Sequence, residues 1–308
     1  MDTKNYVCTI TSDQATQLKN IAEQKGFDLD QIPYSLWRAR QNKLTIVAYA
    51  SGKLTVQGPG TAEFVQFTLE PDVLKEARFG YVTELAKLEN PQMFEPHAGI
   101  DESGKGDYFG PLVIACAYTE STTAQNLLDA GVMDSKKISS DARILQLDAL
   151  IRKECAGKFS LITVGPEAYN RLYTSFGNLN RLLAWGHAKA LEELLKLVPT
   201  CPRAISDQFA STEATVRNAL QERGRAITLE QHPKAEADVA VAAASILARA
   251  EFVRVMKRLG ESITLVLPKG AGPAVTQTAQ TIYRNGGEEA LRKVAKLHFA
   301  ITAAIKQN

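Results

Sequence analysis

Strand-like and helix-like segments alternate along the chain from His97 onward, and this alternation most limits the folds available to it. Two apolar, β-rich segments come first, AGIDES at 98–103 and GPLVIACAYTE at 110–120, and only a short glycine-rich link separates them. A link that short favours an antiparallel pair. Further strands are expected at 159–164 and 203–207, and helices at 140–155, 178–198, 234–258 and 288–307. We therefore predict an α/β fold, in which a mixed sheet is flanked by helices.

Residues 1–80 are expected to form a separate, small α/β domain. Val7–Thr11 is predicted to be a strand, and Ser12 is predicted to cap a helix that runs to Lys25. The β-rich segments at 36–41, 43–50 and 53–58 are broken by turn residues, which predicts an antiparallel meander. A helix is expected over Thr61–Glu70.

The boundary between the two domains is placed at residues 81–96. This segment has a less regular pattern, with prolines at 91 and 96, and is predicted to be a linker. The second domain is then 97–308. A length of 308 residues fits two domains better than one.

Composition excludes several classes of protein. The four cysteines are scattered without a CxxC pair, which argues against a disulfide scaffold or a cysteine zinc site and fits a reducing cytoplasm. The chain has no apolar run of the length that a membrane helix needs, and MDTKNYVCTI lacks the pattern of a signal peptide. We expect a cytoplasmic protein without a membrane partner. The net charge of +2 does not distinguish between partners.

The sharpest local feature is an acidic pair beside a glycine-rich turn. Asp101 and Glu102 follow an apolar strand, and Gly104, Gly106 and Gly110 allow backbone to approach a ligand closely. Adjacent carboxylates at such a turn suit a hard cation such as Mg²⁺, which binds through one or two carboxylates, waters and phosphate oxygens. For an arbitrary acidic pair, a solvated turn is the commoner explanation.

Two further acidic positions are candidates for the same site. Asp207 ends a short apolar run, at the end of a strand where α/β sheets usually bind ligands. Glu236 and Asp238 precede an alanine-rich helix, and a spacing of two puts them on nearly opposite sides of a helix. At most one of this pair should reach Asp101, and the other would be a first-turn acid that the helix dipole favours.

Together these segments resemble the type 2 ribonucleases H, and most closely the ribonuclease HIII branch of that family. The matching segments are DESGKGDYFGPLVIACAY at 101–118, MDSKKIS at 133–139, FGNLNRLLAWGHAKAL at 176–191, DQF at 207–209, KAE and VAVAAASILAR at 234–249, and LPKGA and KLHF near the end. They occur in the order of the family and span almost all of residues 97–300. Any one of them would be weak evidence, but six in order are not a coincidence.

The resemblance implies a metal-dependent endoribonuclease that cleaves the RNA strand of RNA/DNA hybrids and leaves 5′-phosphate and 3′-hydroxyl ends. Asp101, Glu102, Asp207 and Glu236 would be the catalytic carboxylates, holding two Mg²⁺ or Mn²⁺ ions about 3.5–4 Å apart. The KAE match favours Glu236 as the fourth carboxylate. Asp238 stays an alternative, because the gap from KAE to AAASILAR is a residue shorter than the family suggests.

The resemblance also implies substrate contacts outside the carboxylates. Backbone amides around Gly104, Lys105 and Gly106 would recognise the 2′-hydroxyl, the group that distinguishes RNA from DNA. Ser135 and Lys136 would contact phosphate. The histidines, His187 among them, are expected to be packing or hydrogen-bonding residues, since this chemistry needs no histidine nucleophile.

The first domain would be similar to a half of the TATA-binding protein, as in ribonuclease HIII. No carboxylate lies between Asp30 and Glu63, a stretch that holds a group of basic and aromatic residues. That group includes Trp37, Arg38, Arg40 and Lys53. We predict a sheet face that binds the hybrid backbone without reading its sequence. For Trp37 taken singly, a place in the core is equally expected.

Three other functions are kept open. A ribonuclease HII-like enzyme would excise single ribonucleotides from DNA, although the KAE motif and the first domain argue against it. A non-catalytic hybrid-binding protein would lack a carboxylate, whereas all four have a candidate here. A two-metal nuclease could also act on DNA. No obligate protein partner is evident, and a monomer is expected.

Overall fold

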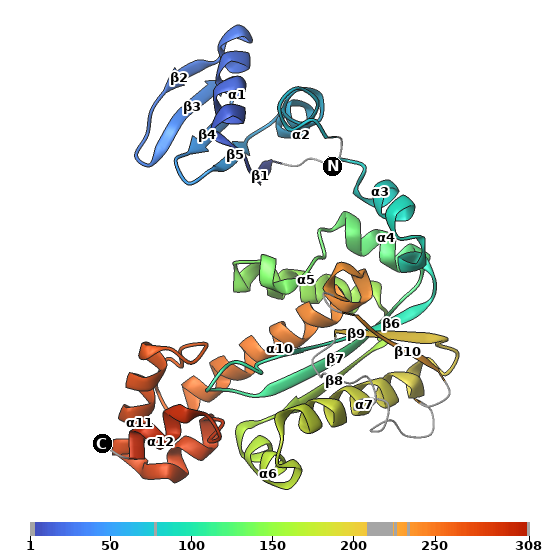
Figure 1. The fold of residues 1–308 in the computed structure, drawn as a ribbon, viewed down its shortest axis with the longest axis vertical. Helices are drawn as coiled ribbons and strands as arrows, with labels where there is room; N and C mark the ends of the chain where they lie inside the picture. The colour runs from blue at the N-terminus through green and yellow to red at the C-terminus, as the bar shows by residue number, and fades with distance from the viewer. Residues whose placement is uncertain (1–3, 77–78, 208–223, 225–226, 233–234, 307–308) are drawn as a thin grey trace. The chain divides into compact units, whose positions relative to one another are not determined.

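The computed structural model describes residues 4–76, 79–207, 224, 227–232 and 235–306 (Figure 1). The chain forms two compact units, Met1–Leu88 and Glu89–Asn308, and each is described by itself. Residues 81–96, predicted to be a less regular linker, are largely helical: they hold α3 (Val82–Glu89) and the 3₁₀-helix η2 (Pro91–Phe94). Pro91 fits there because the first position of a helix does not need an amide N–H.

The first unit is a five-stranded antiparallel sheet in the order β1-β5-β4-β3-β2. Its strands are β1 (Asn5–Thr9), β2 (Asp28–Asp30), β3 (Ser35–Gln41), β4 (Leu44–Tyr49) and β5 (Lys53–Gln57). Helix α1 (Ser12–Gln24) packs on one face through a core that includes Leu18, Ile46 and Leu54. The expected meander and small α/β unit are confirmed.

The structure corrects one local expectation for this unit, the N-cap of α1, and confirms another, the helical segment over Thr61–Glu70, with a different helix type. Thr11, not Ser12, caps α1, and it exchanges hydrogen bonds with Gln14 in a capping box. The helix expected over Thr61–Glu70 is a single turn, α2 (Thr61–Phe64), continued by the π-helix η1 (Val65–Leu74).

The second unit is a mixed sheet in the order β10-β9-β6-β7-β8. Its strands are β6 (His97–Ser103), β7 (Leu112–Thr119), β8 (Phe159–Val164), β9 (Arg203–Asp207) and β10 (Thr228–His232). β6, β7 and β8 pair antiparallel, whereas β9 lies parallel to β6, and β10 parallel to β9. The predicted mixed sheet with an antiparallel beginning is therefore confirmed.

Two long helices cover opposite faces of this sheet (Figure 1). Even-numbered residues of β6 and β7, such as Ile100 and Ile114, join a core with α7 (Leu179–Leu197). Odd-numbered residues face α10 (Val239–Ser262). The contact with α10 is so close that a Cβ on Gly99 would lie 2.1 Å from the backbone of Ala240. The alanine-rich start of α10 thus lies directly on the middle strand.

Seven further helices are described in the second unit after η2. They are α4 (Ser121–Asp129), η3 (Ser135–Lys137), α5 (Asp141–Glu154), α6 (Pro166–Phe176), η4 (Ala235–Ala237), α11 (Pro273–Val294) and α12 (Ala300–Lys306). The continuous helix expected at 288–307 is wrong, because Ala295 leaves the helix to form an antiparallel bridge with Phe109. Among the described residues, no helix has the length and apolar character needed to cross a membrane.

Candidate active site

Two of the predicted carboxylates come together at the ends of neighbouring parallel strands. In the register of β6 and β9, Ile100 lies opposite Ser206. The following residues, Asp101 and Asp207, are therefore side by side, and by strand alternation they point to the same face of the sheet. Both side chains line one cleft. The sheet topology thus juxtaposes carboxylates that are 106 residues apart in the sequence.

Asp101 and Glu102 point to opposite faces, since they are consecutive in a strand. The Asp101 carboxylate faces α10, where the Ser245 hydroxyl hydrogen-bonds it, and it also accepts from the Glu102 amide at 2.7 Å. The Glu102 carboxylate faces α7 and lies 3.0 Å from His187 Nε2. The helix on each side of the sheet therefore orients one carboxylate of the pair.

The two carboxylates have opposite pKa shifts. Burial, together with the charge of Glu102, raises the pKa of Asp101 to about 8. Burial also acts to raise the pKa of Glu102, but the hydrogen bond and charge of His187, with the charges of Lys105 and Lys136, outweigh it and lower the pKa. Glu102 is thus the carboxylate of the pair that more readily carries the negative charge, and a bound cation would favour the ionised form of Asp101.

The cleft around these carboxylates has a volume of about 430 Å³. Most residues predicted to contact catalytic metals or substrate in this unit line it together: Asp101, Glu102, Gly104, Lys105, Gly106, Ser135, Lys136 and Asp207. The turn at Gly104 requires glycine, because its φ is +89° and a Cβ would lie 2.2 Å from the carbonyl oxygen of Pro111. The glycine-rich segment thus forms one wall of the cleft.

Lys136 brings the fourth predicted carboxylate into the same electrostatic neighbourhood. Its ammonium is 3.9 Å from the Glu236 carboxylate. Burial acts to lower the pKa of Lys136, but the charges of Asp101, Glu236, Asp134 and Asp207 outweigh it and raise the pKa. Glu236 itself lies in η4 and does not line the cleft. The Lys136 ammonium is therefore one of the cations that face these carboxylates.

Asp238, the alternative fourth carboxylate, has a structural task instead. It is the N-cap of α10 and accepts from the amides of Ala240 at 2.8 Å and Val241 at 3.3 Å. Its carboxylate also lies 2.9 Å from Nε2 of the buried His97, whose Nδ1 lies 2.7 Å from the Glu95 carbonyl. The His97 ring therefore lies between the Asp238 carboxylate and the Glu95 carbonyl. The Asp238 carboxylate is thus occupied by the cap of α10 and by the contact with His97.

Two residues hold the site from behind: His187, which was expected as a packing or hydrogen-bonding residue, and Arg249, which sequence reasoning missed. The buried His187 also places Nδ1 3.0 Å from the Ser206 hydroxyl, so it links β6 to β9 behind the carboxylates. Arg249 donates to the carbonyls of Ser135 and Ile138, and Ser135 is buried with its hydroxyl 2.6 Å from Ser245. The signal was present, since both His187 and Arg249 lie inside matched segments.

In the first unit, the structure corrects the prediction that Trp37 contacts the substrate. Its side chain is 5% exposed and its indole donates to the Ala15 carbonyl at 3.0 Å, so it belongs to the core beneath α1 and cannot contact substrate as it lies. By alternation, Arg38 and Arg40 point to the other face of β3, and both pair with Asp30. The Arg38 hydrogen bond lowers the pKa of Asp30. Lys53 is exposed at the start of β5.

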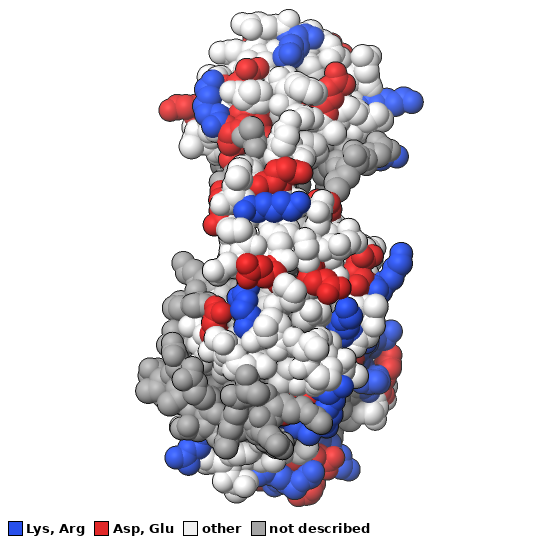
Figure 2. Space-filling model, turned by 90° about the vertical axis from the view of Figure 1, so that its right-hand side faces the viewer, with Lys and Arg blue, Asp and Glu red and all other residues white. Residues whose placement is uncertain are grey.

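Figure 2 shows one face of the molecule, on which basic and acidic side chains are interspersed rather than gathered by sign. This agrees with a net charge of only +2. Attraction of a polyanion to this face would depend on local groups of residues, not on a general positive field.

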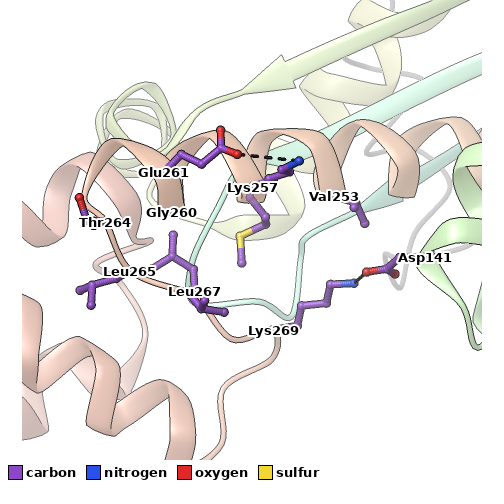
Figure 3. A pocket seen from close by; sticks show the side chains of 11 residues that line it. Asp141, Val253, Lys257, Gly260, Glu261, Thr264, Leu265, Leu267 and Lys269 are labelled. Atoms are coloured by element: carbon purple, nitrogen blue, oxygen red, sulfur yellow. Dashed lines mark hydrogen bonds and ion pairs between the residues drawn. The ribbon is translucent and has the colours of Figure 1, made fainter.

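A second, apolar pocket of about 630 Å³ lies beside the cleft (Figure 3). It is formed by the C-terminal part of α10 and the segment 264–269. Lys269 and Asp141 pair at 2.6 Å on its rim, and Lys269 also lines the carboxylate cleft. Lys257 and Glu261 form another pair on the rim. The charges around this pocket are therefore mutually neutralised.

The carboxylates fit a divalent cation by their chemistry. Their oxygens are hard ligands of the kind that Mg²⁺ and Mn²⁺ prefer, and the Lys136 ammonium already responds to the negative charge concentrated there. Among the residues that the structure describes, no three Asp, Glu, His or Cys side chains are arranged as a ready metal cage. This agrees with the partners found above, because His187 and Lys136 engage the carboxylates instead.

Comparison with protein families gives two matches that follow the two units. Residues 98–302 match the family described as Ribonuclease HII. Residues 5–77 match a family described as a domain of unknown function (DUF3378). The first match covers more than half of the chain and contains Asp101, Glu102, Asp207 and Glu236.

Relatives and solved structures match the chain over nearly its whole length. Ribonuclease HIII of Chlamydia caviae is 42% identical over 96% of this chain and 95% of its own, and ribonuclease HIII of Protochlamydia amoebophila is 41% identical over 97% and 96%. The crystal structure of Bst-RNase HIII in complex with Mn²⁺ is 28% identical, covers 98% of both chains and superposes with a TM-score of 0.64. The chain therefore belongs to the ribonuclease HIII family of type 2 ribonucleases H.

Proposed function

We propose that this protein cleaves the RNA strand of RNA/DNA hybrids, leaving 5′-phosphate and 3′-hydroxyl ends, with Asp101, Glu102, Asp207 and Glu236 as its catalytic carboxylates. The observation that carries the proposal is that Asp101 and Asp207 each follow the last residues paired between β6 and β9, Ile100 and Ser206, and line one cleft. In open α/β sheets, this is where ligands bind. Glu102 adds a third carboxylate from the same strand.

The cofactor is Mg²⁺ or Mn²⁺, and the same four carboxylates would hold two such ions. Bound there, the ions would supply an activated water nucleophile and charge neutralisation at the leaving 3′-oxygen. His187 keeps the Glu102 carboxylate ionised and oriented, and Ser245 orients Asp101. Lys136 is more than half exposed, so its ammonium can move from Glu236 to a substrate phosphate when the carboxylates take a cation.

Recognition of ribose falls to the segment Gly104–Gly106. The αL turn at Gly104 directs backbone of this segment along the cleft wall, where amide groups can bond a 2′-hydroxyl. Ser135 would act mainly through its backbone, since its side chain is buried against Ser245. Arg38, Arg40 and Lys53 of the first unit would contact the phosphate backbone, which positions a duplex without reading its sequence.

The cellular location and the oligomeric state are proposed from fewer observations. All four cysteines are free, and Cys116, Cys155 and Cys201 are buried, which suits a reducing cytoplasm. We propose that the protein acts there as a monomer, because one chain supplies all four carboxylates.

The decisive experiment is cleavage of three labelled duplexes, each with Mg²⁺ and with Mn²⁺: an RNA/DNA hybrid, DNA with a single ribonucleotide, and plain DNA. Multi-site cutting of the hybrid, with poor action on the single ribonucleotide, is expected. Preference for the single ribonucleotide would show HII-like excision instead. Tight hybrid binding without cleavage would leave a binding protein, and cleavage of plain DNA would indicate a general nuclease.

A further inference from the structure

A buried lysine lies directly behind the ribose-reading wall of the cleft. The side chain of Lys296 is fully buried, and its ammonium lies 2.8 Å from the carbonyl of Asp107 and 3.3 Å from that of Phe109. It also lies 5.6 Å from the centre of the Tyr169 ring. Among the described residues, no carboxylate comes within 4 Å of it. The carbonyl oxygens of Asp107 and Phe109 are thus the hydrogen-bond acceptors of the Lys296 ammonium.

Such a placement is costly for folding. An ammonium group removed from water loses hydration that carbonyl dipoles replace only in part, and lysine is almost never fully buried without a charged partner. A methionine or leucine would fill the same space without that cost. The useful consequence of an ammonium here is geometric, because it draws two carbonyls of one short segment toward a single point.

That segment is the continuation of the glycine-rich turn. The C-terminal crossing, residues 294–297, runs beside it: the Gly110 amide donates to the Val294 carbonyl, and the Lys296 amide donates to the Tyr108 carbonyl, each at 2.8 Å. Asn170 of α6 fixes the crossing from behind by bonding the Ala295 carbonyl and the Leu297 amide, each at 2.9 Å. Lys296 therefore acts from a rigid base.

The same segment also fixes the opposite wall. The Asp107 carboxylate accepts from the Gly270 amide at 2.6 Å, and the Tyr108 amide donates to the Gly270 carbonyl at 2.9 Å. Lys269, next to Gly270, lines the cleft. A shift of Asp107 would therefore move two walls of the cleft together.

We propose that Lys296 is a positioning residue for ribose recognition: by binding the carbonyls of Asp107 and Phe109 it holds the Gly104–Gly106 backbone at the distance needed to distinguish a 2′-hydroxyl. This inference rests on the proposed function, because it concerns how that same cleft distinguishes ribose from deoxyribose. It assigns Lys296 no contact with substrate.

The test measures discrimination rather than rate. Lys296→Met is made in an Asp101→Asn background, so that no strand is cut, and binding is measured by fluorescence anisotropy with Mg²⁺. Two probes are compared, an RNA/DNA hybrid and the same hybrid with a 2′-fluoro strand, which keeps a similar helix shape but lacks the hydroxyl donor. The matched control is Lys293→Met, the same substitution at an exposed position three residues earlier.

Lys296→Met is expected to reduce the ratio of the two affinities by about tenfold, as loss of one well-placed hydrogen bond would do, while Lys293→Met leaves it unchanged. An equal loss of affinity for both probes would show a merely structural role and overturn the proposal, as would an unchanged ratio. Circular dichroism establishes whether the variant folds.

If Lys296→Met does not fold, Asp107→Ala decides the question, because it releases the same segment from Gly270 at a half-buried position. The ratio must fall in that variant too, and an unchanged ratio would overturn the proposal. Failure of the proposed function is seen separately: the chain with native Lys296 would then show no preference for the ribose-containing hybrid over the 2′-fluoro hybrid, and the intact protein would not cleave it.

Discussion

At the scale of single residues, Asp101 offers the clearest test of the carboxylate cluster. Asp101→Asn keeps the size and most hydrogen bonds of the side chain but removes charge that would hold the cations. We expect cleavage of the hybrid to fall by about a thousandfold or more, because metal-assisted stabilisation of the transition state contributes several kcal/mol. Hybrid affinity should change little. The control is Glu167→Gln, at the exposed start of α6, and full activity of Asp101→Asn would contradict the metal assignment.

Glu236 and Asp238 should separate catalysis from stability. Glu236→Gln is expected to abolish cleavage and leave the melting temperature near that of the native protein. Asp238→Asn keeps an acceptor for the amides that open α10 but removes the carboxylate charge that lies beside the buried His97 ring. We expect a loss of about 3 kcal/mol in the free energy of unfolding, with cleavage per folded molecule retained. The reverse pattern would make Asp238 the fourth carboxylate.

Lys296 predicts how stability depends on pH. Burial lowers the pKa of its ammonium from 10.5 to about 7. Below pH 7 the lysine is protonated in both the folded and the unfolded state, so the full cost of the buried charge is present. Between pH 7 and 10.5 the folded state releases this proton before the unfolded state does, and the lysine's contribution to stability rises with pH.

Urea unfolding at pH 6.5 and at pH 9 would measure this contribution. The stability of the native protein minus that of Lys296→Met should increase with pH, by at most about 1.4 kcal/mol for each pH unit above 7. Lys293→Met supplies the comparison, and its difference from the native protein should stay constant. A difference that does not change with pH for Lys296→Met would mean that the buried amine keeps its ordinary pKa.

At the scale of elements, the contact between β6 and α10 sets the position of the carboxylates. Gly99→Ala would place a methyl group within 2.1 Å of the Ala240 backbone, so the helix must move away from the strand. We expect a loss of about 3 kcal/mol or a failure to fold, the upper range for overpacking of a core. Gly165→Ala, where no atom lies within 4 Å of the new carbon, should cost far less. Similar melting temperatures for the two variants would contradict the packing described here.

The helices and strands that could be predicted from the sequence are those with an unbroken run or repeat of apolar residues. β6, β7, β8 and β9 were predicted because apolar runs end at turn residues or acids. The edge strand β10 was missed, since Thr228–His232 is short and mixed in polarity. The break after α11 was missed for another reason: residues 288–307 suit a helix locally, but Ala295 pairs with Phe109, a partner 186 positions away.

In the site, too, features set by local sequence could be predicted, and features set by contacts between distant segments could not. Its carboxylates could be predicted because each lies beside a turn or strand end within a recognisable segment. The partners of those carboxylates could not, because His187 comes from α7 and meets Glu102 only after α7 has packed on the sheet. Trp37 illustrates the opposite error, since its spacing among basic residues suggested a surface whereas strand alternation buries it.

At the scale of the whole molecule, the two units should contribute separately to binding and to chemistry. Removal of residues 1–88 leaves a unit with its own core and all four carboxylates. We expect KM for the hybrid to rise by about tenfold or more, and the salt dependence of binding to become shallower, because phosphate contacts are lost. Turnover at saturating substrate should change little.

Substitution of Arg40 and Lys53 together by alanine, in the full chain, provides the matched test. It should reproduce part of the rise in KM without removing a domain. An unchanged KM and salt dependence in both proteins would show that the first unit does not bind the duplex backbone.

The C-terminal crossing also bears on when the enzyme becomes active during its synthesis. The four predicted catalytic carboxylates lie before residue 237, but the glycine-rich wall of the cleft is secured by Val294 and Lys296, which follow much later in the sequence. A nascent chain still held in the ribosome, with those residues inside the exit tunnel, has its acids in place and its glycine-rich segment untethered. The cleft is completed only when residues 294–296 have left the tunnel, so a nascent chain without them lacks the fitted cleft of the folded nuclease.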